Sequence, residues 1–349
     1  MDERRGAAAR AYHERTKHSR QSVQADAFFL DWPNQPMPFK VYTDLEPIPL
    51  PPEPPRAEAP ALACMAAAGE GGQARPTLEA LARLFFLMAG ITKRIEVGGR
   101  AHYFRAAACT GALYHVEVYL VCGEVPAAGG RGLSPGVYHL AVHDYAARRL
   151  REGDFRALLA RAAGEDSAPP ACFVLTSTYW RNAWKYRARA YRHCFWDSGT
   201  MLANLLAAAA ALGVPARVAA SFADGPVNAL LGVNPDEEAA LALVELGERA
   251  PPPPPPAELP ELSLKTMALS PERVDYPLIR EIHAASSLAD GRAAAAWREA
   301  ASRLRDAASL AGGEALPLAP AGAAGDSVDA AILRRGSARR FDRERSIRF

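Results

Sequence analysis

The apolar residues of this chain follow two spacings, and each spacing predicts a different kind of element. In one stretch they recur every three or four residues, at Leu78, Leu81, Leu84, Phe85 and Met88. Thr77 can cap the first turn of this helix, and Gly90 can end it. A second helical pattern covers residues 198–212 and stops at Gly213. The chain is therefore expected to contain two long, largely buried helices.

Alternating or continuous apolar runs elsewhere predict strands. These runs cover residues 115–122, 136–143, 172–178, 216–222 and 241–246. The second run continues through HDYAARRLREGD, which indicates a β-hairpin. Strands mixed with helices predict an α+β domain, or an α/β sandwich, over residues 76–250.

The segments on both sides of this domain differ from it in composition. Residues 1–60 begin with a charged stretch, expected to be helical or poorly ordered, and continue with prolines and aromatics that favour an extended path over another surface. A run of prolines opens a stiff linker over residues 251–269, and the region 270–312 is expected to be helical. After an Ala-rich stretch, residues 328–349 are expected to begin a new unit.

Composition narrows the class of protein. The net charge is +2, and the five cysteines form neither a CxxC pair nor a metal-ligand spacing, so neither a nucleic-acid partner nor a metal site is predicted. The N-terminus lacks the apolar core of a secretion signal, and no apolar run approaches the ~18 residues of a membrane-spanning helix. We therefore expect a cytoplasmic protein in a reducing compartment.

One short turn can contact a planar ligand. In RAAACTGALYHVEVYL, residues 105–120, small and polar residues that include Gly111 lead into an alternating strand. Backbone N–H groups of such a turn, together with the side chains of Cys109 and Thr110, can approach a flat polar ring. An ordinary loop before a strand explains the same residues.

Basic and aromatic side chains interleave over residues 180–199. Arginine and lysine beside aromatic rings can hold a phosphate or stack on a flat ring. Lys185 and Tyr186 are the catalytic candidates, because neighbouring cations lower the pKa of a lysine and a tyrosine can relay its proton. The alternative is a solvated basic loop.

Other polar groups of the chain also bear on ligand binding. Arg335, Ser337 and Arg339 alternate and can converge on one phosphate, although an arginine-rich tail is the alternative. Three groups predict no site: His139 and His143 lack a metal-binding geometry for strands, Asp236–Glu238 are interpreted as a solvated helix start, and Ser198–Gly199 lack the nucleophile elbow.

Six separated blocks, taken in order, resemble one family. The blocks are YHERTKHS, LDWPNQPMPFKVY, RAAACTGALYHVEVYL, WKYRARAYRHCFWDSG, ALGVPARV and SFADGPVNALLGVNPDEEAALALVELG, within residues 12–250. They resemble the SagB/ThcOx group of nitroreductase-like, FMN-dependent dehydrogenases, which oxidise peptide thiazolines and oxazolines to thiazoles and oxazoles. The resemblance implies a nitroreductase-like α+β fold, with a mixed central sheet flanked by helices.

The resemblance also implies roles for particular residues. Lys185 and Tyr186 match the family's catalytic pair, and Arg189, Tyr191 and Arg192 complete its K-Y-x-x-R-x-Y-R pattern as a clamp for substrate or phosphate. The flavin-binding residues implied are Arg105, Cys109, Thr110, Gly111, Arg335, Ser337 and Arg339. Where the family carries Pro, Ser and Pro around the turn, this chain carries Ala108, Cys109 and His115.

The family's R-x-S-x-R phosphate element stands at Arg335–Arg339, after the first unit, which implies the opening of a second unit. Family members place the flavin between two units, so the resemblance implies a homodimer or a tandem pseudo-dimer, with this chain a fragment or a shorter form of it. A peptide substrate and a cyclodehydratase partner are also implied. Two alternatives remain: a degenerate, non-catalytic scaffold or peptide-binding unit, and a generic NAD(P)H-dependent flavin nitroreductase.

Overall fold

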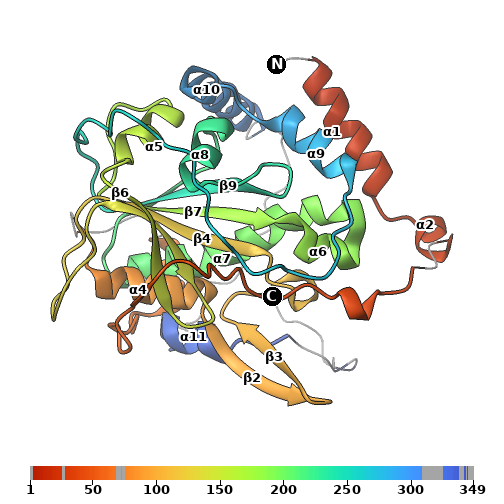
Figure 1. Cartoon of the computed structure of the whole chain (residues 1–349), viewed down its shortest axis with the longest axis horizontal. Helices are drawn as coiled ribbons and strands as arrows, with labels where there is room; N and C mark the ends of the chain where they lie inside the picture. The colour runs from red at the N-terminus through yellow and green to blue at the C-terminus, as the bar shows by residue number, and fades with distance from the viewer. Residues whose placement is uncertain are drawn as a thin grey trace.

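The computed structural model describes residues 3–25, 28–67, 72, 75–308, 325–337, 342 and 344. A seven-stranded sheet runs through its centre (Figure 1). The strands are β1 (Pro47–Pro49), β4 (Val116–Cys122), β5 (Gly136–Ala141), β6 (Ala146–Glu152), β7 (Ala171–Thr178), β8 (Ala216–Ala219) and β9 (Glu238–Leu246). Their order is β1-β6-β5-β4-β7-β9-β8, and each ladder between them is antiparallel. The predicted strands and the β5–β6 hairpin are present.

One face of the sheet is covered by α3 (Ala61–Ala66), α4 (Leu78–Ala89), α7 (Ala190–Ala211) and α11 (Val328–Arg334). The helix α4 has the predicted caps, since Thr77 Oγ1 accepts a hydrogen bond from the N–H of Ala80 at 3.2 Å and Gly90 follows the last turn. Leu120 and Phe173 point into the core on this side. The helix α7 begins at Ala190, earlier than the sequence pattern predicted.

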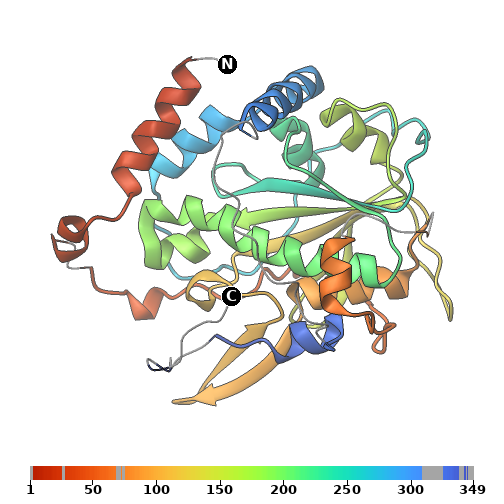
Figure 2. The same cartoon turned by 180° about the vertical axis from the view of Figure 1, so that it is seen from behind.

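The opposite face carries α5 (Arg156–Ala162), α8 (Asp224–Leu231) and α10 (Gly291–Ala308). Figure 2 shows the sheet from behind, with α7 lying across it. Val121 and Val174, the neighbours of Leu120 and Phe173 in sequence, belong to this second core. Both faces of β4 and β7 are therefore buried, which explains their continuous apolar sequence.

A third cluster closes one end of the sheet. It joins α1 (Glu3–Thr16), α6 (Tyr179–Tyr186) and α9 (Pro277–Ser286), with α2 (Arg20–Ala25) and the short turns η1 (Trp32–Asn34) and η3 (Arg187–Arg189) nearby. Tyr12, Trp180, Trp184 and Ile279 are buried here. The alternative of a solvated basic loop over residues 180–199 is therefore wrong for residues 180–184, which are buried in α6.

Two extended segments, far apart in sequence, cross the sheet side by side (Figure 1). Met37 N–H donates to Leu269 O at 2.7 Å, Met267 N–H to Val41 O at 2.9 Å, and Thr43 N–H to Lys265 O at 3.0 Å. The proline-rich stretch after Phe28 thus lies extended over another surface, as its composition predicted.

The helix α11 packs on the first core, although the sequence suggested a new unit there. Val328 and Ile332 are buried among α3, α4 and α7, and Asp329 forms an ion pair with Arg83 of α4. The prediction of a second unit beyond it stays a prediction. No helix in the described part of the chain combines the length and apolar character needed to cross a bilayer.

Candidate functional site

The turn singled out from the sequence follows a hairpin, β2 (Ile91–Val97) and β3 (Arg100–Arg105), that extends from the body of the protein (Figures 1 and 2). It contains η2 (Thr110–Ala112), in which Gly111 has φ +66° and Ala112 has φ +54°. A Cβ atom on Gly111 would lie 2.8 Å from the hydroxyl oxygen of Tyr186. The structure thus places the turn against Tyr186, one of the two catalytic candidates.

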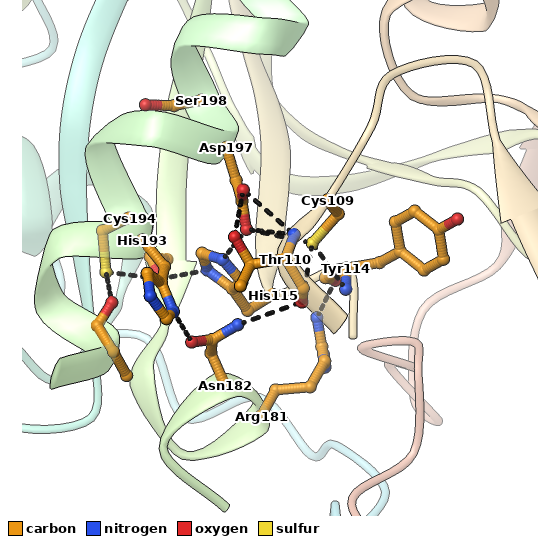
Figure 3. Close-up of polar contacts among 12 residues, drawn as sticks. Cys109, Thr110, Tyr114, His115, Arg181, Asn182, His193, Cys194, Asp197 and Ser198 are labelled. Atoms are coloured by element: carbon orange, nitrogen blue, oxygen red, sulfur yellow. Dashed lines mark hydrogen bonds and ion pairs between the residues drawn. The ribbon is translucent and has the colours of Figure 1, made fainter. Parts of the chain in front are cut away.

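The side chains of the turn are directed at Asp197 of α7 (Figure 3). Thr110 donates to Oδ1 through its N–H at 3.0 Å and through its hydroxyl at 2.8 Å, and the thiol of Cys109 donates to Oδ2 at 3.1 Å. Nε2 of His115 lies 2.8 Å from the same Oδ2. Cys109 and Thr110 therefore meet a buried carboxylate. Backbone N–H groups of the turn are engaged as well, since Ala112 N–H donates to Cys109 O at 3.0 Å and Tyr114 N–H donates to Sγ of Cys109 at 3.1 Å.

Further polar residues surround this carboxylate. Nδ1 of His115 is 2.8 Å from the hydroxyl of Ser177, which also accepts a hydrogen bond from the thiol of Cys194 at 3.2 Å. Asn182 of α6 bonds the ring of His193 at 2.7 Å and reaches Thr110 O at 3.5 Å. These bonds tie the turn to β7, α6 and α7.

Burial and pairing set the charges in this network. Burial raises the pKa of Cys109, and Asp197 raises it further, so the thiol stays protonated and donates. Burial lowers the pKa of His115 and keeps its ring neutral. Burial by itself raises the pKa of Asp197, but hydrogen bonds from His115 and Thr110 outweigh this effect and hold its pKa below the usual value.

A second network of buried, hydrogen-bonded polar groups lies behind the turn. Arg181 of α6, fully buried, donates to Tyr114 O at 2.9 Å and to Oε1 of Glu117 at 2.6 Å. Oε2 of Glu117 is 3.1 Å from Nε2 of His139. Since an unpaired buried charge is costly, the Arg181–Glu117 pair fixes how α6 sits on β4.

Two of the arginines predicted to bind phosphate flank the same turn. Arg105 is buried, and its guanidinium lies 4.9 Å from the ring centroid of Tyr114 and donates to Pro38 O at 2.7 Å. Burial lowers its pKa to about 10. Arg335 donates to Ala106 O at 3.1 Å and to Arg105 O at 3.2 Å, although it lies far away in sequence. Ser337 is exposed beyond it, and Arg339 lies outside the described residues.

The catalytic candidates lie at the C-terminal end of α6. The ring of Tyr186 packs edge-on against His193 with centroids 4.6 Å apart, and burial raises the pKa of the Tyr186 hydroxyl. Nζ of Lys185 lies 5.6 Å from the centroid of the Tyr186 ring. The structure therefore brings Lys185, Tyr186, Gly111, Arg105 and Arg335 to one region.

Arg189, Tyr191 and Arg192 do not converge with this group. Arg189 donates to Thr16 O, Arg192 donates to Thr16 Oγ1 at 3.0 Å, and the hydroxyl of Tyr191 lies 3.3 Å from His283. These contacts fasten α1 and α9 to α7. All three side chains are engaged within the protein, and their expected role as a substrate or phosphate clamp stays a prediction.

Sequence reasoning missed a polar cluster on the other side of α6. Nζ of Lys40 is 2.9 Å from Oε2 of Glu238, and the hydroxyl of Tyr119 donates to Oε1 of Glu238 at 2.8 Å. Lys40 and Glu238 line a cavity of about 730 Å³. The interpretation of Asp236–Glu238 as a solvated helix start is wrong for Glu238, which begins β9 and is buried. No local signal marks this pair, whose members are 198 positions apart.

Two observations test whether the turn suits a flavin. Nε of Arg105 is buried without a hydrogen-bond partner in the part of the chain that the structure describes. Gly111 is packed against Tyr186, since a Cβ atom there would lie 2.8 Å from the Tyr186 hydroxyl oxygen, so the Tyr186 ring covers this part of the turn. Nε of Arg105 is the donor that remains for a ligand, and a buried guanidinium N–H fits a phosphate oxygen.

Solved structures of nitroreductase-like proteins are similar to this chain. A candidate nitroreductase from Anabaena variabilis superposes with a TM-score of 0.61 at 28% identity, over 81% of this chain and 55% of that one. A candidate nitroreductase from Ralstonia eutropha gives 0.46 at 19% identity, over 61% and 99%. The E. coli microcin synthetase McbBCD complex with truncated pro-MccB17 bound gives 0.42 at 20% identity, over 71% and 94%.

Two other comparisons found no match, one with protein-family models and one with curated proteins. This chain spans about half the length of the Anabaena protein. The superposition on that protein agrees with the antiparallel sheet and its flanking helices. The chain has a nitroreductase-like α+β fold.

Proposed function

We propose that this protein is an FMN-dependent oxidoreductase of the SagB/ThcOx type, which oxidises azolines in peptides to azoles. One observation carries the proposal. The turn at Cys109–Gly111, the arginines Arg105 and Arg335, and the Lys185–Tyr186 pair lie together, although they come from three separate parts of the sequence. The nitroreductase-like fold supports oxidoreductase chemistry as the general class.

The residues of this region suit separate tasks. The turn can lie against the edge of the flavin ring, and Arg105 and Arg335 can pair with its phosphate. FMN, when bound, supplies the hydride acceptor. Lys185 and Tyr186 would then hold or accept the proton that leaves the substrate. The Tyr186 hydroxyl lies against Gly111 of the turn, and Nζ of Lys185 lies 5.6 Å from the centroid of the Tyr186 ring.

A peptide substrate and a cyclodehydratase partner belong to the same proposal. The flavin site is completed by a second unit, either another copy of the chain or a tandem half. The length of the Anabaena protein, of which this chain covers 55%, is consistent with a second unit in such proteins.

FMN titration and turnover test the proposal together. The full chain, alone and with the second unit, is titrated with FMN and followed by its absorbance, and then assayed on an azoline-containing peptide. Lys185→Ala and Tyr186→Phe are expected to keep FMN while turnover falls at least ~100-fold. Lys265→Ala, on an exposed segment, is the control. Failure to take up FMN in any assembly would contradict the proposal.

One observation favours a second candidate, a non-catalytic scaffold or peptide-binding unit. The side chains of Cys109 and Thr110 are both engaged by Asp197, so they are not presented to a ligand. On this candidate, an assembled complex keeps its turnover when Lys185 and Tyr186 are replaced. Rapid bleaching of bound flavin by NADPH would instead indicate a generic nitroreductase.

A further inference from the structure

Three donor atoms of different chemistry converge beneath the turn. Sγ of Cys109, a ring nitrogen of His115 and a carboxylate oxygen of Asp197 all lie within 4.8 Å of one another. Oδ2 of Asp197 is 2.8 Å from Nε2 of His115 and 3.1 Å from Sγ of Cys109 (Figure 3). Thiolate, imidazole and carboxylate are the donors that zinc takes in proteins. We propose that Cys109, His115 and Asp197 bind a divalent cation of the zinc type.

The neighbours of these donors orient them for a metal. The hydroxyl of Thr110 donates to Oδ1 of Asp197 at 2.8 Å, and the N–H of Thr110 is shared between Oδ1 at 3.0 Å and Oδ2 at 2.9 Å. These bonds hold the carboxylate in place, with Oδ2 also facing Cys109 and His115. Nδ1 of His115 lies 2.8 Å from the hydroxyl of Ser177. A metal-binding histidine usually has its second nitrogen held by such a partner, which fixes the ring and its tautomer.

The spacing of the donors suits a tetrahedral ion after a small adjustment. Zinc bonds of ~2.0–2.3 Å at tetrahedral angles separate the donor atoms by ~3.4 Å. The two contacts to Asp197, at 2.8 and 3.1 Å, therefore need to lengthen by about 0.6 and 0.3 Å, and the separation between Sγ of Cys109 and the His115 nitrogen, which is within 4.8 Å, must reach the same value. A cavity of about 10 Å³ adjoins two of the donors, Cys109 and Asp197, and is also lined by Arg105 and Met201 but not by His115. Its volume corresponds to about one water, which can serve as the fourth ligand from the side of Cys109 and Asp197.

Protons and charges balance when the cation binds. The thiol proton of Cys109 leaves to solvent, and the metal replaces the hydrogen bond from this thiol to Asp197. The ring of His115 stays neutral, because its proton moves from Nε2 to Nδ1 and is donated to Ser177. One thiolate and one carboxylate then neutralise the two positive charges of the ion. The turn and α7 become joined by coordinate bonds in place of hydrogen bonds.

Titration of the full chain with Co²⁺ in the absence of FMN tests this site directly. We expect about one equivalent to bind, with a near-ultraviolet charge-transfer band from thiolate to cobalt and visible bands of a tetrahedral ion, and Zn²⁺ to displace it. Cys109→Ser should lose the charge-transfer band. Cys194→Ser is the matched control, since this buried thiol lies 3.2 Å from Ser177 but outside the donor set.

Two further measurements keep the proposal falsifiable if Cys109→Ser does not fold. Ser177→Ala should weaken Co²⁺ binding ~10–100-fold while leaving the charge-transfer band in place at saturation. In the unmodified protein, binding of Zn²⁺ should release about one proton per ion from the thiol of Cys109, as measured with a pH indicator in weakly buffered solution. Absence of Co²⁺ binding, a band that persists in Cys109→Ser, or Zn²⁺ binding without proton release would each overturn the proposal. These measurements do not depend on FMN uptake. They therefore test the metal site even if the proposed function is wrong.

Discussion

Gly111 occupies a left-handed position, with φ +66°, at the contact between the turn and Tyr186. A side chain there would meet two costs. The backbone conformation disfavours any residue with a Cβ atom, and the added atom would lie 2.8 Å from the hydroxyl of Tyr186. The first cost acts on folding alone, whereas the second acts on the position of a catalytic candidate.

A matched pair of variants separates these costs. Gly111→Ala and Gly99→Ala both place alanine at positive φ, but a Cβ atom at Gly99 meets no atom within 4 Å. We expect each to lower the free energy of unfolding by about 1–2 kcal/mol in urea. Only Gly111→Ala should also weaken FMN binding, by about tenfold, which corresponds to ~1.4 kcal/mol. Equal FMN affinity in the two variants would contradict the assignment of the turn to the flavin.

His193 gives the folded protein a pH dependence of known sign. Burial lowers the pKa of its ring to about 4, below the ~6.5 of an exposed histidine. The unfolded chain therefore binds more protons between pH 6.5 and pH 4, so the contribution of His193 to stability is complete above pH 6.5 and is lost as the pH falls through this window.

Thermal melts of the native protein and of His193→Gln, at pH 7 and pH 4.5, measure this contribution. We expect the melting temperature of the native protein to fall further between the two pH values, because glutamine does not titrate. Carboxylates elsewhere titrate in both proteins and cancel in the comparison. If the melting temperatures of the two proteins fall equally between pH 7 and pH 4.5, the pKa of His193 is not lowered in the folded protein.

At the scale of elements, α4 could be predicted from residues within its own segment of sequence. The burial of α6 depends instead on residues that are far away in the chain. The caps and the apolar spacing of α4 all lie within Thr77–Gly90, so the sequence contains its whole explanation. In α6, Arg181 and Asn182 are buried because Glu117 and Thr110, more than 60 positions away, receive their hydrogen bonds. Such pairings are set by topology, and a sequence window around residues 180–199 shows only charged and aromatic side chains.

The same limit explains which parts of the candidate site were foreseen. The sequence pointed to Cys109, Thr110, Lys185 and Tyr186, which do lie in one region. It gave no indication of Asp197, on which the turn depends, because a single aspartate in an aromatic-rich helix has no distinctive spacing. Its partners Cys109 and His115 lie 88 and 82 positions away.

The helix α11 offers a test of whether residues 328–334 belong to the first domain. Ile332→Ala removes a side chain that is 8% exposed in the core, whereas Leu333→Ala removes one that is 42% exposed on the same helix. We expect the first to lower the free energy of unfolding by about 2 kcal/mol and the second by less than about 0.5 kcal/mol. Urea unfolding measures both. Equal effects would indicate that α11 docks only loosely on this core.

At the scale of the whole molecule, the candidate site lies beside an exposed aromatic surface. Phe195 and Trp196 of α7 are 48% and 52% exposed, and Asp197 follows them directly. Large exposed aromatics of this kind are typical of interfaces between proteins. Under the proposed function, the second unit completes the flavin site from this side.

This arrangement predicts that one substitution on the exposed aromatic surface weakens both FMN uptake and the association of two units. Trp196→Glu adds a charge beside the turn, whereas Trp297→Glu, at a tryptophan of α10 that is 47% exposed, adds the same charge elsewhere. Light scattering after size-exclusion chromatography should show pairing reduced at least ~10-fold in Trp196→Glu alone, because a buried unpaired charge costs several kcal/mol. FMN absorbance per chain should fall in parallel. If Trp196→Glu loses pairing but keeps its FMN, the flavin site lies within a single unit. If Trp196→Glu behaves like Trp297→Glu, the interface between units lies on another face.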